Sequence, residues 1–298
     1  MDPEAAMSRN ELDKLGTDEQ RMEEARRHLE QALALRRQLA RGNPATYLPD
    51  MAVTLNNLGN LARMENNMAE ARQYYEEGLQ IHARLAQQNL DPYPADRAMA
   101  MINLGYLEKS KLENDKAVQH FEGGLEIYRQ LAEQDPEQYL PKVAEALNSL
   151  AVANRDEKRM SEARLAYEEA LRIRRQLAEQ NRAANLPYLA VTLNDLGVLD
   201  AAENRNEDAR QHYEEALTLY RQLAQQDPET YTRYLAGSLN NLAFLFGSQN
   251  RLAESRAHYD EALGLYRKLF QADPNQYAGD VARVESSLEQ LDRKVRSK

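Results

Sequence analysis

The sequence predicts an all-α protein, a solenoid of stacked helix-turn-helix repeats, and three observations predict this fold. A string of the type Asn-Asn-Leu-Gly-Asn-Leu recurs every 46 residues, starting at residues 56, 102, 148, 194 and 240. Ala, Leu, Glu, Gln and Arg dominate the composition, and these are strong helix formers. No copy contains an alternating, strand-like run. Because one unit of this size cannot bury both of its faces, neighbouring units must stack to form the core.

Small and aromatic residues keep the same register as the repeated string. The small column is Ala25, Ala71, Ala117, Ala163, Ala209 and Ser255. Four residues later lie Leu29, Tyr75, Phe121, Tyr167, Tyr213 and Tyr259. Small residues let two helices approach closely, and we expect the large side chains to fill the space between neighbouring layers.

Each copy predicts two helices joined by a tight turn. In the copy that starts at Tyr47, we expect the first helix at about 49–64, because proline suits the first helical position. Asn66, Asn204 and Asn250 share the turn column, and asparagine tolerates the left-handed conformation found at helix ends. The second helix is expected at about 69–88. Second helices should stop at Asn43-Pro44, Asp135-Pro136, Asp227-Pro228 and Asp273-Pro274.

The period divides the chain into one continuous solenoid domain. We expect an N-terminal capping repeat at 1–46, full repeats at 47–92, 93–138, 139–184, 185–230 and 231–276, and a C-terminal capping helix at 277–298. The first helix within residues 1–20 is expected to be short and polar. The last helix carries one apolar stripe, formed by Val281, Val284, Leu288, Leu291 and Val295. Capped ends of this kind keep a repeat stack in solution.

The repeated residues resemble the pattern of a known family. Leu55-x-x-Leu58-Gly59, followed by Ala71-x-x-x-Tyr75-x-x-Gly78, resembles the tetratricopeptide repeat pattern. The resemblance recurs in register along essentially the whole chain, but the unit is 46 residues long instead of about 34. The long form is similar to the repeats of kinesin light chain and of bacterial scaffold and sensor proteins. The resemblance implies a right-handed superhelix whose first helices line a concave, peptide-holding groove.

Amide side chains occupy two columns that the family pattern places in this groove. The first column contains Asn56, Asn148, Asn194 and Asn240, and the second contains Asn57, Asn103, Asp195 and Asn241. An amide has donors and an acceptor, so it can pair with a peptide backbone whatever the peptide's side chains are. We therefore expect a ladder that binds an extended segment. The alternative is that these side chains bond to neighbouring helices or to water.

Two further columns break the repeat. Asn60, Tyr106 and Phe244 lie in the first, and three basic residues, Arg63, Lys109 and Arg155, begin the second before it turns to Ala201 and Gly247. In an acidic chain this asymmetry predicts a positive patch for an acidic peptide or a terminal carboxylate. The alternative is that the basic side chains pair with nearby glutamates on a solvated face.

Composition and motifs limit the other functions. The net charge of −10 opposes nucleic-acid binding, and no apolar run is long enough to span a membrane. The chain has no cysteine and none of the common catalytic or phosphate-binding motifs, so we expect no enzyme activity and no cofactor. His28, His120, His212 and His258 share a column, but layers about 10 Å apart cannot share one metal ion.

We expect a cytoplasmic scaffold, monomeric or weakly self-associating, that binds a protein or peptide. The alternatives are a ligand-sensing module of a larger signalling protein and, from another class, an enzyme.

Overall fold

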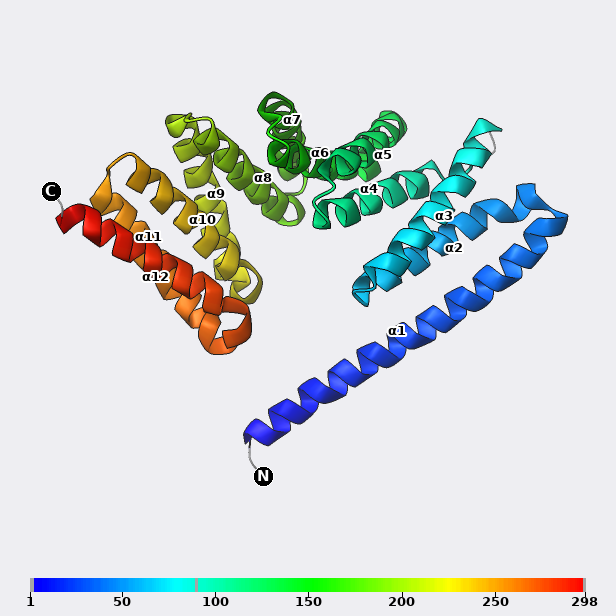
Figure 1. Cartoon of the computed structure of the whole chain (residues 1–298), viewed down its shortest axis with the longest axis horizontal. Coiled ribbons are helices and arrows are strands. Elements are labelled where there is room, and N and C mark those ends of the chain that lie inside the picture. Colours follow the sequence, from blue (N-terminus) through cyan, green and yellow to red (C-terminus); the bar gives the residue numbers. More distant parts are fainter. Residues whose placement is uncertain (1–2, 89–90, 297–298) are drawn as a thin grey trace. The chain divides into compact units, whose positions relative to one another are not determined.

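A computed structural model describes residues 3–88 and 91–296 of the chain. Within these ranges the chain forms twelve α-helices and no strand, so the predicted all-α class is confirmed (Figure 1). The helices are α1 (Pro3–Gly42), α2 (Pro44–Met64), α3 (Met68–Gln87), α4 (Pro94–Ser110), α5 (Asn114–Gln134), α6 (Pro136–Asp156), α7 (Met160–Gln180), α8 (Arg182–Ala202), α9 (Asn206–Gln226), α10 (Pro228–Ser248), α11 (Leu252–Ala272) and α12 (Pro274–Arg296). They form two compact units, Met1–Tyr139 and Leu140–Lys298.

Most second helices are joined to the next first helix by a single residue. Asp227 shows how this works: its N–H donates to the carbonyl of Leu223 at the end of α9, and its carboxylate accepts from the N–H of Thr230 in α10. Pro228 follows at the first helical position, where its missing N–H costs nothing. Asn43, Asp135, Asn181 and Asp273 cap the following helices through the same side-chain bond.

The start expected for the first helices is wrong by about five residues. α2 begins at Pro44, and Pro49 lies inside the helix, as do Pro141 in α6 and Pro187 in α8. The reason is that the Asn-Pro or Asp-Pro pair that ends one helix also caps and starts the next. The second-helix bounds were predicted to within one residue, since α3 covers Met68–Gln87.

The turns between paired helices use the left-handed backbone conformation. Asn66, Asn204 and Asn250 have φ values of 60°, 59° and 64°, which confirms the role predicted for that column. Leu112 and Lys158 occupy the same turn with φ values of 60° and 61°. The turn is therefore imposed by the packing of the two helices even where the residue type does not favour it.

The aromatic column packs against the small residues of the first helices. In the first unit Tyr75 is fully buried, and a side chain added at Gly59 would come within 2.5 Å of its ring. In the second unit Tyr213 packs in the same way against Gly197, where the corresponding distance is 2.8 Å. The glycines of the repeated string therefore allow a close helix-to-helix approach.

The two ends of the chain depart from the expected pattern. α1 is one continuous helix of 40 residues, although a short first helix was expected within residues 1–20. Gln20, a good helix former, occupies the position at which later copies make their left-handed turn. In α12, Val284 and Leu291 are buried as predicted, but Val295 is exposed and lies outside the core. None of the helices in the described ranges combines the length and apolar character needed to cross a bilayer.

Candidate partner-binding surface

The predicted amide side chains of the first unit bond to one another and to neighbouring helices. Asn56 of α2 is fully buried, and its Nδ2 donates to the carbonyl of Asp96 in α4 over 2.9 Å. The Oδ1 of Asn60 accepts from the Tyr75 hydroxyl at 2.7 Å and from Asn103 Nδ2 at 2.9 Å. Asn57 is exposed. Asn56 therefore belongs to the interior, as the alternative interpretation anticipated, while Asn57 and Asn60 reach the surface.

The second unit contains a similar row of polar side chains on its first helices. Asn148 Nδ2 of α6 donates to Asp195 Oδ2 of α8 at 3.1 Å, and Asn241 Nδ2 of α10 donates to Asn194 Oδ1 at 3.3 Å. All four side chains are partly exposed. The Oδ1 atoms of Asn148 and Asn240 are buried and accept no hydrogen bond within the described chain. The row therefore runs from helix to helix and retains unused bonding capacity.

The aromatic members of the next column are placed differently in the two units. Tyr106 of α4 is half-buried and packs edge-on against Phe121, with ring centroids 5.3 Å apart. Phe244 of α10 has 68% of its surface exposed. A single exposed apolar side chain is common on protein surfaces, so Phe244 alone does not identify a binding surface.

The basic column is divided between the two units. Arg63 is exposed on α2 beside Tyr75, and Lys109 is half-buried on α4. Arg155 of α6 is half-buried and donates to the Asp156 carboxylate at 3.1 Å. Burial raises the pKa of Tyr167, and the nearby charge of Arg155 opposes this rise. Arg155 is thus partly engaged inside its own unit, and a joint positive patch stays a prediction.

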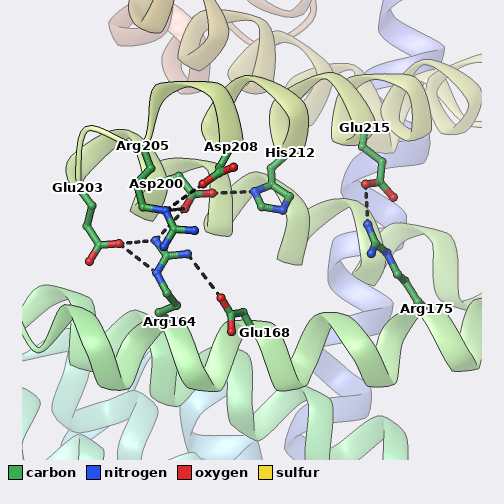
Figure 2. Close-up of polar contacts among 9 residues, drawn as sticks. All are labelled: Arg164, Glu168, Arg175, Asp200, Glu203, Arg205, Asp208, His212 and Glu215. Carbon is green, nitrogen blue, oxygen red and sulfur yellow. Dashed lines mark hydrogen bonds and ion pairs between the residues drawn. The ribbon is translucent and has the colours of Figure 1, made fainter.

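A buried charged cluster that joins a first helix to two second helices was not foreseen from the sequence. Figure 2 shows Asp200 of α8 bonded to Arg164 of α7 and His212 of α9. Asp200 is fully buried, with distances of 2.7 Å to the Arg164 guanidinium and 2.7 Å to His212 Nδ1. Arg164 also contacts Glu203 and Glu168. The cluster joins the end of one repeat to both helices of the next.

The protonation of Asp200 follows from these contacts. Burial raises the pKa of Asp200, but hydrogen bonds from His212 and Arg164 and their charges bring it below its ordinary value of 3.8. The carboxylate is therefore charged at neutral pH and holds both partners in place. A charge buried in this way needs all of its partners, so the cluster fixes the geometry between α7, α8 and α9.

The first unit repeats the cluster 92 residues earlier. Glu108 of α4 is buried, and its carboxylate lies 2.6 Å from His120 Nδ1 and 3.5 Å from the Arg72 guanidinium. The sequence contained a signal for both clusters. An arginine 36 residues before and a histidine 12 residues after flank positions 108, 200 and 246 of this column, and of these three positions only 108 and 200 are acidic.

Three of the four arginines that line the cleft beside the second cluster already pair with carboxylates. The cleft has a volume of about 480 Å³ between α7 and α9, and four arginines line it. Arg164 and Arg205 already pair with Asp200, and Arg175 pairs with Glu215 at 2.7 Å (Figure 2). Within the described residues no group of three His, Asp or Glu side chains could hold a metal ion. The clusters therefore stabilise the stack, and the first helices remain the candidate surface.

Comparison with known families decides what kind of repeat this is. Three tetratricopeptide repeat models match residues 16–84, 116–178, and 189–228 with 235–275, which together make up more than two thirds of the chain. The chain belongs to the tetratricopeptide repeat family. Such repeats are typically non-catalytic and suggest a protein-interaction scaffold. No curated protein matches the sequence at a significant level.

Solved structures share the tetratricopeptide fold at low sequence identity. BtubC (BKLC) from P. vanneervenii has 20% identity and a TM-score of 0.63, covering 83% of this chain and 92% of that one. The apo form of RapI has 15% identity and a TM-score of 0.59, covering 83% and 82%. A putative kinesin light chain from Podosopora anserina with nearly identical repeats has 16% identity and a TM-score of 0.56, covering 75% and 98%. At these identities the likeness concerns the fold alone.

Proposed function

We propose that this tetratricopeptide repeat protein is a scaffold whose first helices bind an extended segment of a protein partner. The observation that carries the proposal is the polar row on the first helices of the second unit, which links neighbouring helices and is partly exposed. In the second unit it runs from Asn148 to Asp195 and from Asn194 to Asn241. A segment lying across α6, α8 and α10 meets one such group per layer.

The chemistry of the row favours the backbone of the partner over its side chains. Each amide offers two donors and one acceptor, and the bonds within the row use only part of them. An extended peptide presents its own N–H and C=O groups at regular intervals of about 3.3 Å per residue. Recognition through these groups tolerates many sequences, so side-chain specificity has to come from other residues on the same face.

Charged residues supply a second part of the proposal. Arg63 and Arg155 lie seven residues, or about two helical turns, beyond Asn56 and Asn148, and Lys109 holds the same place in its copy, near the ends of α2, α4 and α6. In a chain of net charge −10 they favour a partner segment that carries carboxylates. A terminal carboxylate and an acidic side chain would both pair with these basic residues.

The test compares partner capture by the wild-type chain and by the double variant Asn148→Ala with Asn194→Ala. We expect the variant to lose specific partners and keep its helical circular dichroism spectrum. The matched control changes two exposed amides at the ends of second helices, Gln180→Ala with Gln226→Ala, and should capture as the wild type does. Equal capture by all three proteins would reject the polar row as the binding surface.

A further inference from the structure

The second half of α1 presents a face that later second helices bury against the first helix of their own repeat. By register, residues 20–42 of α1 correspond to α3 one period later. In α3 the stripe that packs against α2 is formed by Ala71, Gly78, Ile81 and Leu85. The corresponding residues of α1, which we call the α1 stripe, are Ala25, Ala32, Leu35 and Leu39.

The α1 stripe is exposed, whereas the stripe of α3 is buried throughout. Leu35 has 56% of its surface exposed and Leu39 has 38%. Ala25 is also exposed, and Ala32 is half-buried. A single exposed leucine is common, but these residues follow one another along about 21 Å of helix. Because residues 3–42 form one continuous helix, no first helix of the same repeat folds back onto the stripe (Figure 1).

The first half of α1 contains the sequence that matches the missing first helix. By register, residues 3–19 correspond to residues 49–65, nearly all of which belong to α2. Leu12 and Leu15 hold the columns of Leu58 and Leu61, which are buried in α2. Within one helix, at 1.5 Å per residue, the centres of residues 3–19 and of the stripe lie about 30 Å apart. Residues 3–19 therefore do not cover the stripe of their own chain.

An antiparallel pair of α1 helices from two copies of the chain brings the matching halves together. A twofold axis near Gln20 places residues 3–19 of each copy beside residues 25–39 of the other, and such an interface is self-complementary. A parallel pair would instead place two acidic segments side by side, since residues 3–19 contain five Asp or Glu and two Lys or Arg. Charge and register thus favour the same antiparallel arrangement.

We propose that the chain forms a dimer by exchanging its first helix, with residues 3–19 of each copy covering the α1 stripe of the other. Each copy supplies the first helix that the first repeat of its partner lacks. The exchange covers the apolar end of the stack, as terminal caps do in repeat proteins. It does not involve the polar row, and the dimer carries two copies of the proposed partner-binding face.

The first test measures the dimer dissociation constant by sedimentation equilibrium. We expect Leu35→Glu with Leu39→Glu to raise it about tenfold or more, because two leucines that the second copy covers become charged. Both leucines are exposed in the single chain, so the helical circular dichroism spectrum should be retained. The matched control, Ala34→Glu with Gln38→Glu, adds the same charges at exposed positions outside the stripe and should dimerise as the wild type does. A monomeric wild type, or equal constants for the three proteins, overturns the proposal.

A disulfide distinguishes exchange between two copies from a hairpin within one copy. A Cβ added at Gly78 would lie 3.6 Å from the Cβ of Leu55, and disulfides span Cβ separations of about 3.5–4.5 Å. Arg9 and Ala32 hold the columns of Leu55 and Gly78 one period earlier, and the chain has no cysteine of its own. In Arg9→Cys with Ala32→Cys we expect oxidation to link two chains, which a non-reducing gel shows as a dimer.

The control for the disulfide is Arg9→Cys with Ala34→Cys, which moves the second thiol to another side of α1 and should link far less. A disulfide closed within one chain, or equal linking in both variants, overturns the proposal.

The outcomes also separate the dimer from the proposed function. Asn148→Ala with Asn194→Ala should dimerise as the wild type does. A monomeric wild type that captures partners through the polar row rejects the dimer and leaves the proposed function standing. A dimer whose partner capture is unaffected by the two asparagine changes rejects the polar row and leaves the dimer standing.

Discussion

Asp200 and Glu108 are buried carboxylates that depend on partners from neighbouring helices. Each receives contacts from an arginine of the preceding second helix and a histidine of its own repeat. A buried charge of this kind is strongly destabilising when its partners are removed, but it contributes little when exchanged as a whole for apolar residues. The cluster positions centred on the repeat at 139–184 are uncharged throughout, with Val118, Asn154 and Ala166 at the corresponding positions.

Removing the Asp200 carboxylate should destabilise the second unit. For Asp200→Ala we expect a loss of about 3 kcal/mol in the free energy of unfolding, because Arg164 and His212 lose their buried partner. Urea denaturation followed by circular dichroism measures it. Glu203→Ala removes a more exposed partner of the same arginine and should cost less than about 1 kcal/mol. Equal losses for the two variants would show that Asp200 is not the centre of the cluster.

His258 should make stability depend on pH. Burial lowers the pKa of His258 from 6.5, Arg221 lowers it further, and Glu261, Glu254 and Glu214 oppose the change. A folded-state pKa below the unfolded value means that the unfolded chain binds more protons. The contribution of His258 is therefore complete above pH 6.5 and is lost as the pH falls through the folded-state pKa.

The measurement is the midpoint of urea unfolding between pH 7.5 and 5.0. We expect the wild type to lose stability on acidification and His258→Phe to lose less, since phenylalanine can still stack on Phe246, whose ring centroid lies 5.5 Å from that of His258. The same pH dependence in both proteins would contradict the assignment.

The basic column gives a prediction about the partner. We expect Arg63→Gln with Lys109→Gln to weaken capture of an acidic partner, because two positive charges are lost, and to make capture less sensitive to salt. Glutamine keeps the helix and avoids placing a carboxylate beside Tyr75. Capture measured at low and high salt tests this, and an unchanged salt dependence would contradict it.

At the scale of helices, the repeated spacing was sufficient to predict the type and number of elements per repeat. The turn residues and second-helix ends followed from Asn66 and from the Asp-Pro pairs. The starts of the first helices could not be predicted in this way. A residue such as Asp227 both ends one helix and caps the next, and the sequence does not distinguish these two roles. The buried clusters were also missed, since Glu108 and Asp200 lie in a column that holds Ala62, Asn154 and Phe246 in the other full repeats, and only comparison of whole copies reveals their partners.

Helix capping at the single-residue joints should be measurable. In Asp227→Ala, α10 loses the acceptor for the Thr230 N–H, and we expect about 1 kcal/mol of stability to be lost. Hydrogen bonds from Thr230 hold the pKa of Asp227 below its ordinary value of 3.8, so the loss should shrink as the pH falls below 3.8 and through the folded-state pKa. Unfolding of the variant and the wild type at pH 7 and pH 3 checks this.

At the scale of the whole chain, each compact unit has its own core. Ala236, Tyr259, Val284 and Leu291 belong to one cluster within the second unit, and Ala62, Tyr75 and Leu104 belong to one within the first. Repeat proteins are stabilised by contacts between adjacent repeats, so a group of adjacent repeats can fold without the remainder. The positions of the row residues could be predicted from the repeat, but the burial of Asn56 could not, because it depends on a bond to α4 in the next repeat.

A fragment covering residues 135–298 should therefore fold. We expect far-UV circular dichroism to show a helical spectrum and a cooperative urea transition, because the capped helices and the core cluster of the second unit are all retained. A fragment without a cooperative transition would show that the second unit requires the first.

The single-residue joints restrict how this chain can change in length. An α-helix turns by about 100° per residue, so adding one residue at Asn181 would rotate α8 and direct its apolar stripe away from α7 and α9. A turn or a surface loop ordinarily accommodates such an insertion. A joint in which one residue caps both helices cannot accommodate it without moving one of the helices. The array should therefore lengthen or shorten by duplication or loss of complete helix pairs, with single-residue insertions eliminated at the joints.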